Sequence, residues 1–208
     1  MPAPTAVIFD CDGVLFDSWR ANVAYYDAIR ARLGLPPMDV AWHERVHVLA
    51  GSAVLEAMFG DDPALHDAAR AAARTVDYEP FFALMEPVPG LHDVLAALAP
   101  RHRLAMATNR GSTVAEVVRR FGLDRWLAAA VGVLDVAHPK PHPDVLHEAL
   151  ARLGVGPADA VYVGDAESDL AAATAAGVRF VGVGATPWAP VQVATLAELP
   201  PLLAAGAA

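Results

Sequence analysis

The sequence predicts an α/β fold in which a doubly wound, Rossmann-like parallel sheet is interrupted by an inserted all-helical domain. Three observations support this prediction. A continuous apolar run opens the chain at Val7 and stops at a carboxylate. Residues 17–88 then show helical spacing without a clear strand. From there on, short apolar runs alternate with helical stretches, which is typical of βαβ units and a parallel sheet.

The first strand ends at a pair of aspartates. Val7, Ile8 and Phe9 are apolar on both faces, as expected for a buried parallel strand, and Asp10 follows where the strand stops. Side chains alternate along a strand, so Asp10 and Asp12 are expected on one side and Cys11, a packing residue, on the other. Gly13 allows the backbone to turn closely past whatever the carboxylates hold. Two neighbouring carboxylates require a metal ion, a lysine or both.

The predicted domain boundaries follow from caps and breakers. Residues 17–88 form the insertion, and residues 1–16 and 89–208 form the α/β core. Four or five helices are expected in the insertion. The first covers 19–33, with Asp17 or Ser18 as N-cap and Gly34 as its stop; the second covers 40–50, the third follows Gly51 and the fourth opens at Asp62 and Pro63.

The core elements alternate regularly after Pro87, Pro89 and Gly90. The expected strands are 104–108, 130–133, 160–163 and 178–183, and the expected helices are 91–98, 113–121, 143–153, 168–176 and a short one near 195–203.

Composition limits the possible partners. The 208 residues include 24 acidic and 15 basic side chains, and the net charge of −9 argues against nucleic acid or an anionic membrane. The longest apolar run, residues 126–134, is too short to span a bilayer. No secretory signal is visible at the start, and the single cysteine suits a reducing cytoplasm. We therefore expect a cytoplasmic protein.

Polar side chains follow each remaining strand of the core. Thr108 and Asn109 end one strand, Lys140 lies in the next loop, and Asp165 and Asp169 follow the strand after that. The carboxyl ends of parallel strands meet at one edge of the sheet, so these groups should converge there. Lys140 is the only lysine among the 15 basic residues, which marks a position where a compact ammonium differs from a guanidinium.

These motifs resemble those of the haloacid dehalogenase superfamily. Its four motifs match this chain in order at Asp10 and Asp12, at Thr108, at Lys140, and at Asp165 with Asp169. The pattern is most similar to the phosphoglycolate-phosphatase-like members with a helical cap after the first motif. The resemblance implies a Mg²⁺-dependent phosphatase of a small phosphorylated metabolite, acting as a monomer or a homodimer.

The resemblance also implies roles for the acids. Asp10 would be the nucleophile that forms an aspartyl phosphate, and Asp12 the general acid and then the general base. Mg²⁺ would take carboxylate oxygens from Asp10 and Asp165 and the backbone carbonyl of Asp12. Because Mg²⁺ keeps several waters, Asp169 is expected as an outer or water-mediated partner.

The remaining motif residues would bind the phosphoryl group. Lys140 would neutralise Asp10 and the phosphoryl oxygens, while the Thr108 hydroxyl, nearby backbone N–H groups and Asn109 would hold substrate oxygens.

Residues of the inserted domain would select the organic part of the substrate. The candidates are Arg20, Arg45, Gly51 and Ser52. His43 and His47 are four residues apart, but a solvated or core helix face explains them better than a metal pair.

Three alternatives stay open. A sugar-phosphate phosphomutase shares all four motifs. A receiver-type phosphoacceptor module also gathers aspartates, a threonine and a lysine, but its acceptor aspartate should lie at a middle strand end and its lysine should come last. An inactive regulatory homologue is disfavoured because every catalytic residue type is present.

Overall fold

The computed structural model describes residues 4–49 and 51–206, and the chain divides into two compact units. Residues 1–16 and 87–208 contribute to the first, called here the α/β unit. Residues 17–86 form the second, called here the helical unit. The chain passes between them through two strands of two residues each, β2 (Phe16–Asp17) and β3 (Glu86–Pro87), which pair with each other.

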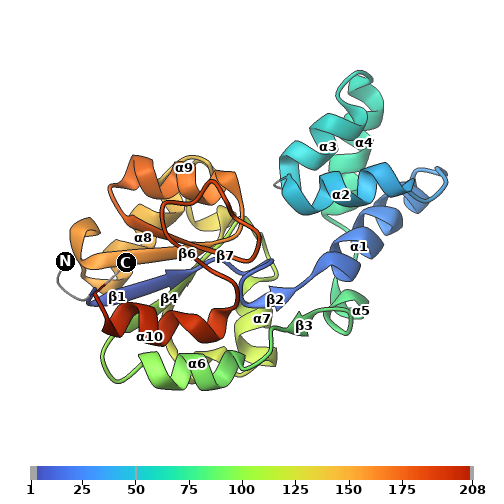
Figure 1. The fold of residues 1–208 in the computed structure, drawn as a ribbon. Helices are drawn as coiled ribbons and strands as arrows, with labels where there is room; N and C mark the ends of the chain where they lie inside the picture. Colours follow the sequence, from blue (N-terminus) through green and yellow to red (C-terminus); the bar gives the residue numbers. More distant parts are fainter. Residues whose placement is uncertain (1–3, 50, 207–208) are drawn as a thin grey trace. The chain divides into compact units, whose positions relative to one another are not determined.

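A six-stranded parallel sheet forms the centre of the α/β unit (Figure 1). Its strand order is β5-β4-β1-β6-β7-β8, so the first strand of the chain is central. Phe9, the last residue of β1, is in register with Met106 on one side and Val163 on the other. The strands are β1 (Ala6–Phe9), β4 (Arg103–Ala107), β5 (Leu127–Val131), β6 (Ala160–Gly164), β7 (Arg179–Val183) and β8 (Gln192–Val193).

Helices cover both faces of this sheet, as Figure 1 shows, with α8 and α9 on one side and α6 and α10 on the other. All residues of β1 and β6 are buried, because neither face meets solvent. Ile8 packs in one cluster with Leu146 of α8 and Ala173 of α9. The predicted doubly wound α/β fold is confirmed. The helices of this unit are α6 (Leu91–Leu98), α7 (Val114–Arg120), α8 (Asp144–Leu153), α9 (Glu167–Ala176) and α10 (Leu199–Ala204).

Two details of the sheet differ from the prediction. Strand β5 begins at Leu127 and ends at Val131, earlier than the expected residues 130–133. The reason lies after the strand, where the backbone N–H of Gly132 donates to Asp135 and starts a short 3-10 helix, Val133–Asp135. Strand β8 was not expected, because two residues are too few to show an alternation.

The helical unit contains α1 (Trp19–Arg32), α2 (Val40–Val48), α3 (Gly51–Phe59), α4 (Pro63–Ala73) and α5 (Glu79–Phe82). Asp39 caps α2 and Asp62 caps α4, each accepting a backbone N–H from the residue three positions on. Tyr26, Ile29 and Val54 are buried in the unit's own core. Within the described residues, no helix has both the length and the apolar character needed to cross a membrane.

Candidate active site

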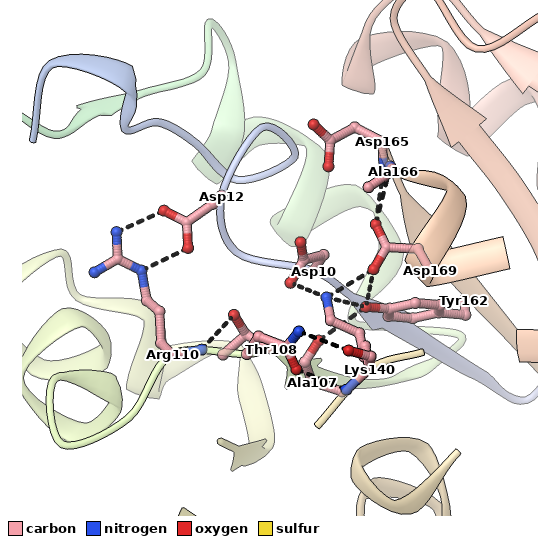
Figure 2. Close-up of polar contacts among 11 residues, drawn as sticks. Asp10, Asp12, Ala107, Thr108, Arg110, Lys140, Tyr162, Asp165, Ala166 and Asp169 are labelled. Atoms are coloured by element: carbon pink, nitrogen blue, oxygen red, sulfur yellow. Dashed lines mark hydrogen bonds and ion pairs between the residues drawn. The ribbon is translucent and has the colours of Figure 1, made fainter. Parts of the chain in front are cut away.

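The candidate site lies at the carboxyl edge of the three central strands of the α/β unit (Figure 2). Asp10 follows β1, Thr108 follows β4 and Asp165 follows β6. The sheet pattern continues one residue past the strands, because the Asp10 N–H donates to the Val163 carbonyl at 2.9 Å and the Thr108 N–H to the Val131 carbonyl at 3.0 Å. The sheet therefore fixes where these side chains begin.

The Lys140 ammonium lies at the centre of the site. Its Nζ is 2.7 Å from Asp10 Oδ1, 2.7 Å from Asp169 Oδ1 and 3.0 Å from the Tyr162 hydroxyl. An ammonium has three protons, and each has a partner here. The side chain is only 3% exposed, so a planar guanidinium would need different partners in the same space. This geometry explains why a chain that otherwise uses arginine has lysine at position 140.

The site carries more negative charge than this single lysine offsets. Burial raises the pKa of Asp10 to about 7; Lys140 opposes the shift, and the charges of Asp169 and Asp12 add to it. Burial also raises the pKa of Asp165 to about 8, with further contributions from Asp10 and Asp169. Burial alone would lower the pKa of Lys140, but the two carboxylates outweigh it, so the pKa is raised and the lysine stays charged. The uncompensated charge lies on the aspartates.

Asp169 uses both of its oxygens within the protein. Oδ1 accepts from Lys140 and lies 3.1 Å from the Tyr162 hydroxyl, and Oδ2 accepts the backbone N–H groups of Asp165 and Ala166, both at 3.1 Å. The side chain is fully buried. Asp169 therefore ties the start of α9 to the lysine and has little capacity left for a direct metal bond.

Tyr162 is a site residue that the sequence analysis missed. It lies on β6 with its ring fully buried, and its hydroxyl contacts Lys140, Asp169 and the Ala107 carbonyl, the last at 3.0 Å. A tyrosine inside a strand that is buried on both faces must find a partner for its hydroxyl, and this was the available signal.

Asn109 holds the loop that carries the lysine. Its side-chain oxygen accepts the Lys140 N–H at 2.8 Å, and its amide nitrogen donates to the Lys140 carbonyl at 3.1 Å. Asn109 was predicted to bind substrate, but both of its polar atoms are engaged with this backbone. Thr108 is 1% exposed, and its hydroxyl oxygen accepts the Arg110 N–H at 3.2 Å.

The Asp12 side chain is turned away from the lysine toward Arg110, as Figure 2 shows. Arg110 makes two contacts with it, from Nε at 2.8 Å and from Nη2 at 2.6 Å. The arginine side chain is 7% exposed and the aspartate 25% exposed. Arg110 was not among the predicted residues, because an arginine after a strand resembles an ordinary solvated loop charge. Cys11, between the two aspartates, is fully buried, and burial raises the pKa of its thiol.

Gly13 lies directly against the Asp165 carboxylate. A Cβ on Gly13 would be 1.9 Å from Asp165 Oδ2, and the residue has a φ of 79°, where only glycine is unstrained. The backbone thus approaches the carboxylate as closely as a bare glycine permits.

Replacing Gly13 by alanine should therefore displace Asp165 and strain the turn. We expect a loss of about 1–3 kcal/mol in the free energy of unfolding and weaker binding of any cation held by Asp165. Chemical denaturation and metal titration would measure both. Gly34→Ala is the matched control, because Gly34 has a similar φ of 73° but meets nothing within 4 Å; equal effects of the two variants would mean that backbone strain alone is responsible.

Three carboxylates lie close enough together to surround a metal ion, with Asp10 and Asp165 as the ones free to bind it directly. Oxygen atoms of Asp10, Asp165 and Asp169 all lie within 4.8 Å of one another. Asp10 Oδ1 is buried and, beyond its ion pair with Lys140, has no hydrogen-bond partner among the described residues. Carboxylate oxygens are the ligands that Mg²⁺ prefers. The residues present therefore fit a hard divalent cation.

The four predicted specificity residues belong to the helical unit. Arg20 is exposed and lies 3.6 Å from Glu86, and the exposed Arg45 stacks over the Trp42 ring at 4.5 Å. The Gly51 carbonyl accepts the Tyr26 hydroxyl at 3.4 Å. The side chains of Ser52 and His47 lie outside the described part of the structure, so the prediction for Ser52 and the interpretation of His43 and His47 are not tested.

Comparison with known proteins gives consistent results. A sequence model described as Haloacid dehalogenase-like hydrolase matches residues 7–183. A phosphoglycolate phosphatase of Xanthomonas campestris is 33% identical over 187 residues, covering 87% of this chain and 83% of that protein. A β-phosphoglucomutase of Bacillus subtilis is 28% identical over 188 residues, covering 86% and 83%. The crystal structure of a HAD-superfamily hydrolase, subfamily IA, variant 1, from Geobacter sulfurreducens is 35% identical, covers 97% of each chain and has a TM-score of 0.77.

Proposed function

The chain belongs to the haloacid dehalogenase-like hydrolase family, and from this premise we propose that it is a Mg²⁺-dependent phosphatase of a small phosphomonoester. The observation that carries the proposal is the convergence of Asp10, Lys140 and Asp165 at one sheet edge, with excess negative charge that a cation and a phosphoryl group would share. The similarity to a phosphoglycolate phosphatase favours a small phosphorylated carboxylic acid as substrate.

Asp10 is the proposed nucleophile. Its carboxylate oxygen forms a bond to phosphorus while the bond to the substrate's alkoxide oxygen breaks, giving an aspartyl phosphate. Water then attacks that phosphorus and releases phosphate, which regenerates the carboxylate. Bound Mg²⁺ would supply charge neutralisation at the phosphoryl oxygens, held by Asp10, Asp165 and the Asp12 carbonyl.

Asp12 is the proposed general acid for the leaving alkoxide and then the base for the water. The guanidinium of Arg110 favours the ionised form of the carboxylate, which suits the base role. Asp12 must part from Arg110 when it carries a proton to the leaving oxygen. We therefore propose Arg110 as a positioning residue for Asp12.

Lys140 and Thr108 are proposed to hold the phosphoryl oxygens. Because each ammonium proton already has a partner, substrate binding would exchange one protein contact for a phosphoryl oxygen. Asp169 and Asn109 would act through Lys140, the first on its ammonium and the second on its backbone. We propose that the helical unit serves as a cap, with Arg20, Arg45, Gly51 and Ser52 contacting the organic part of the substrate.

Phosphate release from a panel of phosphomonoesters tests the function. We expect turnover of 2-phosphoglycolate or another small phosphomonoester with Mg²⁺ and a loss of activity with a chelator, because the divalent cation then no longer neutralises the phosphoryl oxygens. No turnover across the panel would contradict the proposal.

The second candidate, a sugar-phosphate phosphomutase, is favoured by the similarity to β-phosphoglucomutase. Isomerisation of a hexose phosphate faster than phosphate release would select it. A long-lived aspartyl phosphate that alters protein binding would instead indicate a signalling module.

Metal and pH should act together on stability. The pKa of Asp10 is about 7 and that of Asp165 about 8, against 3.8 for an ordinary aspartate. At a pH above 3.8 and below these raised values, the folded chain therefore binds more protons than the unfolded chain. The metal-free chain should therefore lose stability as the pH rises from about 4 to about 8. The raised pKa of Lys140 adds nothing in this window, because the lysine is charged in both states. Thermal unfolding with a chelator would show this trend.

Mg²⁺ binds the ionised carboxylates, so it should raise the midpoint more at about pH 8 than at about pH 6. The Asp165→Asn variant is the control and should lose most of this difference. Equal protection at both pH values would contradict the assignment of the carboxylates as the metal site.

A further inference from the structure

Two histidines and an aspartate gather beside the lysine loop, apart from the three carboxylates of the candidate active site. His138 and His142 flank Lys140, and Asp144 begins α8. His138 Nδ1 lies 3.0 Å from Asp144 Oδ2, and His142 Nδ1 lies 2.7 Å from Asp144 Oδ1. The two imidazole rings are 4.4 Å apart between centroids. Two imidazole nitrogens and one carboxylate thus meet at one place, with one ligand atom of each within 4.8 Å of the others.

We propose that His138, His142 and Asp144 bind a divalent transition-metal ion of the Zn²⁺ class. Imidazole nitrogens with a carboxylate oxygen suit Zn²⁺, whereas Mg²⁺ prefers oxygen ligands alone. Tetrahedral Zn²⁺ with bonds of about 2.0–2.2 Å keeps its ligand atoms roughly 3.4 Å apart. The nitrogen-to-oxygen distances of 2.7 and 3.0 Å are a few tenths of an ångström shorter. Zn²⁺ would therefore bind when the two histidine rings and the Asp144 carboxylate move apart by a few tenths of an ångström and the Nδ1 protons are released to solvent.

The loop is already ordered for this ligand set. Pro139, Pro141 and Pro143 restrict the backbone between the ligands. The Asn109 amide holds the Lys140 backbone from both sides, and the His138 N–H donates to Asp144 Oδ2 at 3.1 Å. Binding would therefore order few additional groups, which lowers its entropic cost.

The exposure of the ligands indicates an exchangeable site rather than a closed one. The His138 side chain is 62% exposed and that of His142 is 52% exposed, so water can complete the coordination. The site differs in this respect from the carboxylates of Asp10 and Asp169, which are buried and offer oxygen ligands alone. Because its ligands flank Lys140, an occupied site would also restrain the loop that carries the ammonium.

A zinc titration tests the proposal without relying on activity. The full chain carrying Asp165→Asn, which weakens the carboxylate cluster, is titrated with Zn²⁺ against a chromophoric indicator in excess Mg²⁺. We expect one Zn²⁺ per chain, and at least about tenfold weaker binding after His138→Gln, His142→Gln or Asp144→Asn, since even the loss of an outer partner of a metal ligand has such an effect. His147→Gln is the matched control, an exposed histidine one turn into α8, and should leave affinity unchanged.

Co²⁺ provides a second readout in the unmodified chain. A four-coordinate nitrogen and oxygen set should give intense visible bands that disappear with His138→Gln, whereas a six-coordinate oxygen site gives weak ones. Zinc binding that survives both histidine substitutions, equal weakening by His147→Gln, or no binding at all would each overturn the assignment. Because the readout is metal binding, failure here is distinguishable from failure of the phosphatase proposal.

Discussion

Replacing Asp10 by asparagine should lower the rate of phosphate release by at least about 10⁴-fold, as removing a nucleophile does in other enzymes. The amide keeps the size and the position of the carboxylate but cannot form the bond to phosphorus. Its effect on folding should be small, because Lys140 retains Asp169 and Tyr162 as partners and the neutral amide replaces a carboxylate whose ionisation is disfavoured by burial.

Steady-state kinetics and denaturant unfolding on the same preparation would separate the two effects. Asp93→Asn is the matched control, an exposed acid on α6 of the same unit, and should leave both unchanged. Acid quenching of the unmodified enzyme with labelled substrate should trap a phosphorylated chain that the Asp10→Asn variant lacks. An Asp10→Asn variant with a tenth of the normal rate would show that another group attacks phosphorus.

Replacing Lys140 by methionine should damage both catalysis and folding. The buried carboxylates of Asp10 and Asp169 lose the one cation that lies close to both among the described residues, and breaking a buried ion pair in this way costs about 3–5 kcal/mol of stability. The rate should fall by about 10²–10³-fold, since a charge aimed at the phosphoryl oxygens is removed.

The loss of stability should depend on pH in a defined direction. Without the ammonium, the pKa values of Asp10 and Asp165, which Lys140 lowers, rise further, so lowering the pH protonates and neutralises these two carboxyl groups and recovers part of the stability. Unfolding curves near the upper and lower ends of the neutral range would show this recovery. Lys140→Arg keeps the charge but cannot match three partners within this buried volume, so it should also be impaired; full activity of that variant would mean that charge alone suffices.

The fold and the main site residues could be predicted from the sequence because both depend on local signals. Apolar runs ending in polar residues identify the ends of parallel strands, and the sheet brings Asp10, Thr108 and Asp165 to one edge. The fold class and the membership of the haloacid dehalogenase superfamily are confirmed. The roles of individual residues stay predictions.

The missed residues depend on contacts between distant segments. Tyr162 resembles a core residue in the sequence. Its hydroxyl belongs to the site because the loop that carries Lys140 brings the ammonium into contact with it. Arg110 pairs with Asp12 across 98 positions of sequence, so no local pattern could reveal it. Alternation along a strand predicted the Asp12 side chain on the same side as Asp10. In the folded chain its orientation is instead set by the contact with Arg110.

The burial of the only lysine has a consequence beyond the reaction. Enzymatic or chemical acylation of lysine amines is a frequent route of regulation, and on this chain the sole such amine is 3% exposed and surrounded by acids. Reagents that modify lysine amines therefore have no exposed target on the folded protein, and acylation of Lys140 would require the native structure to open.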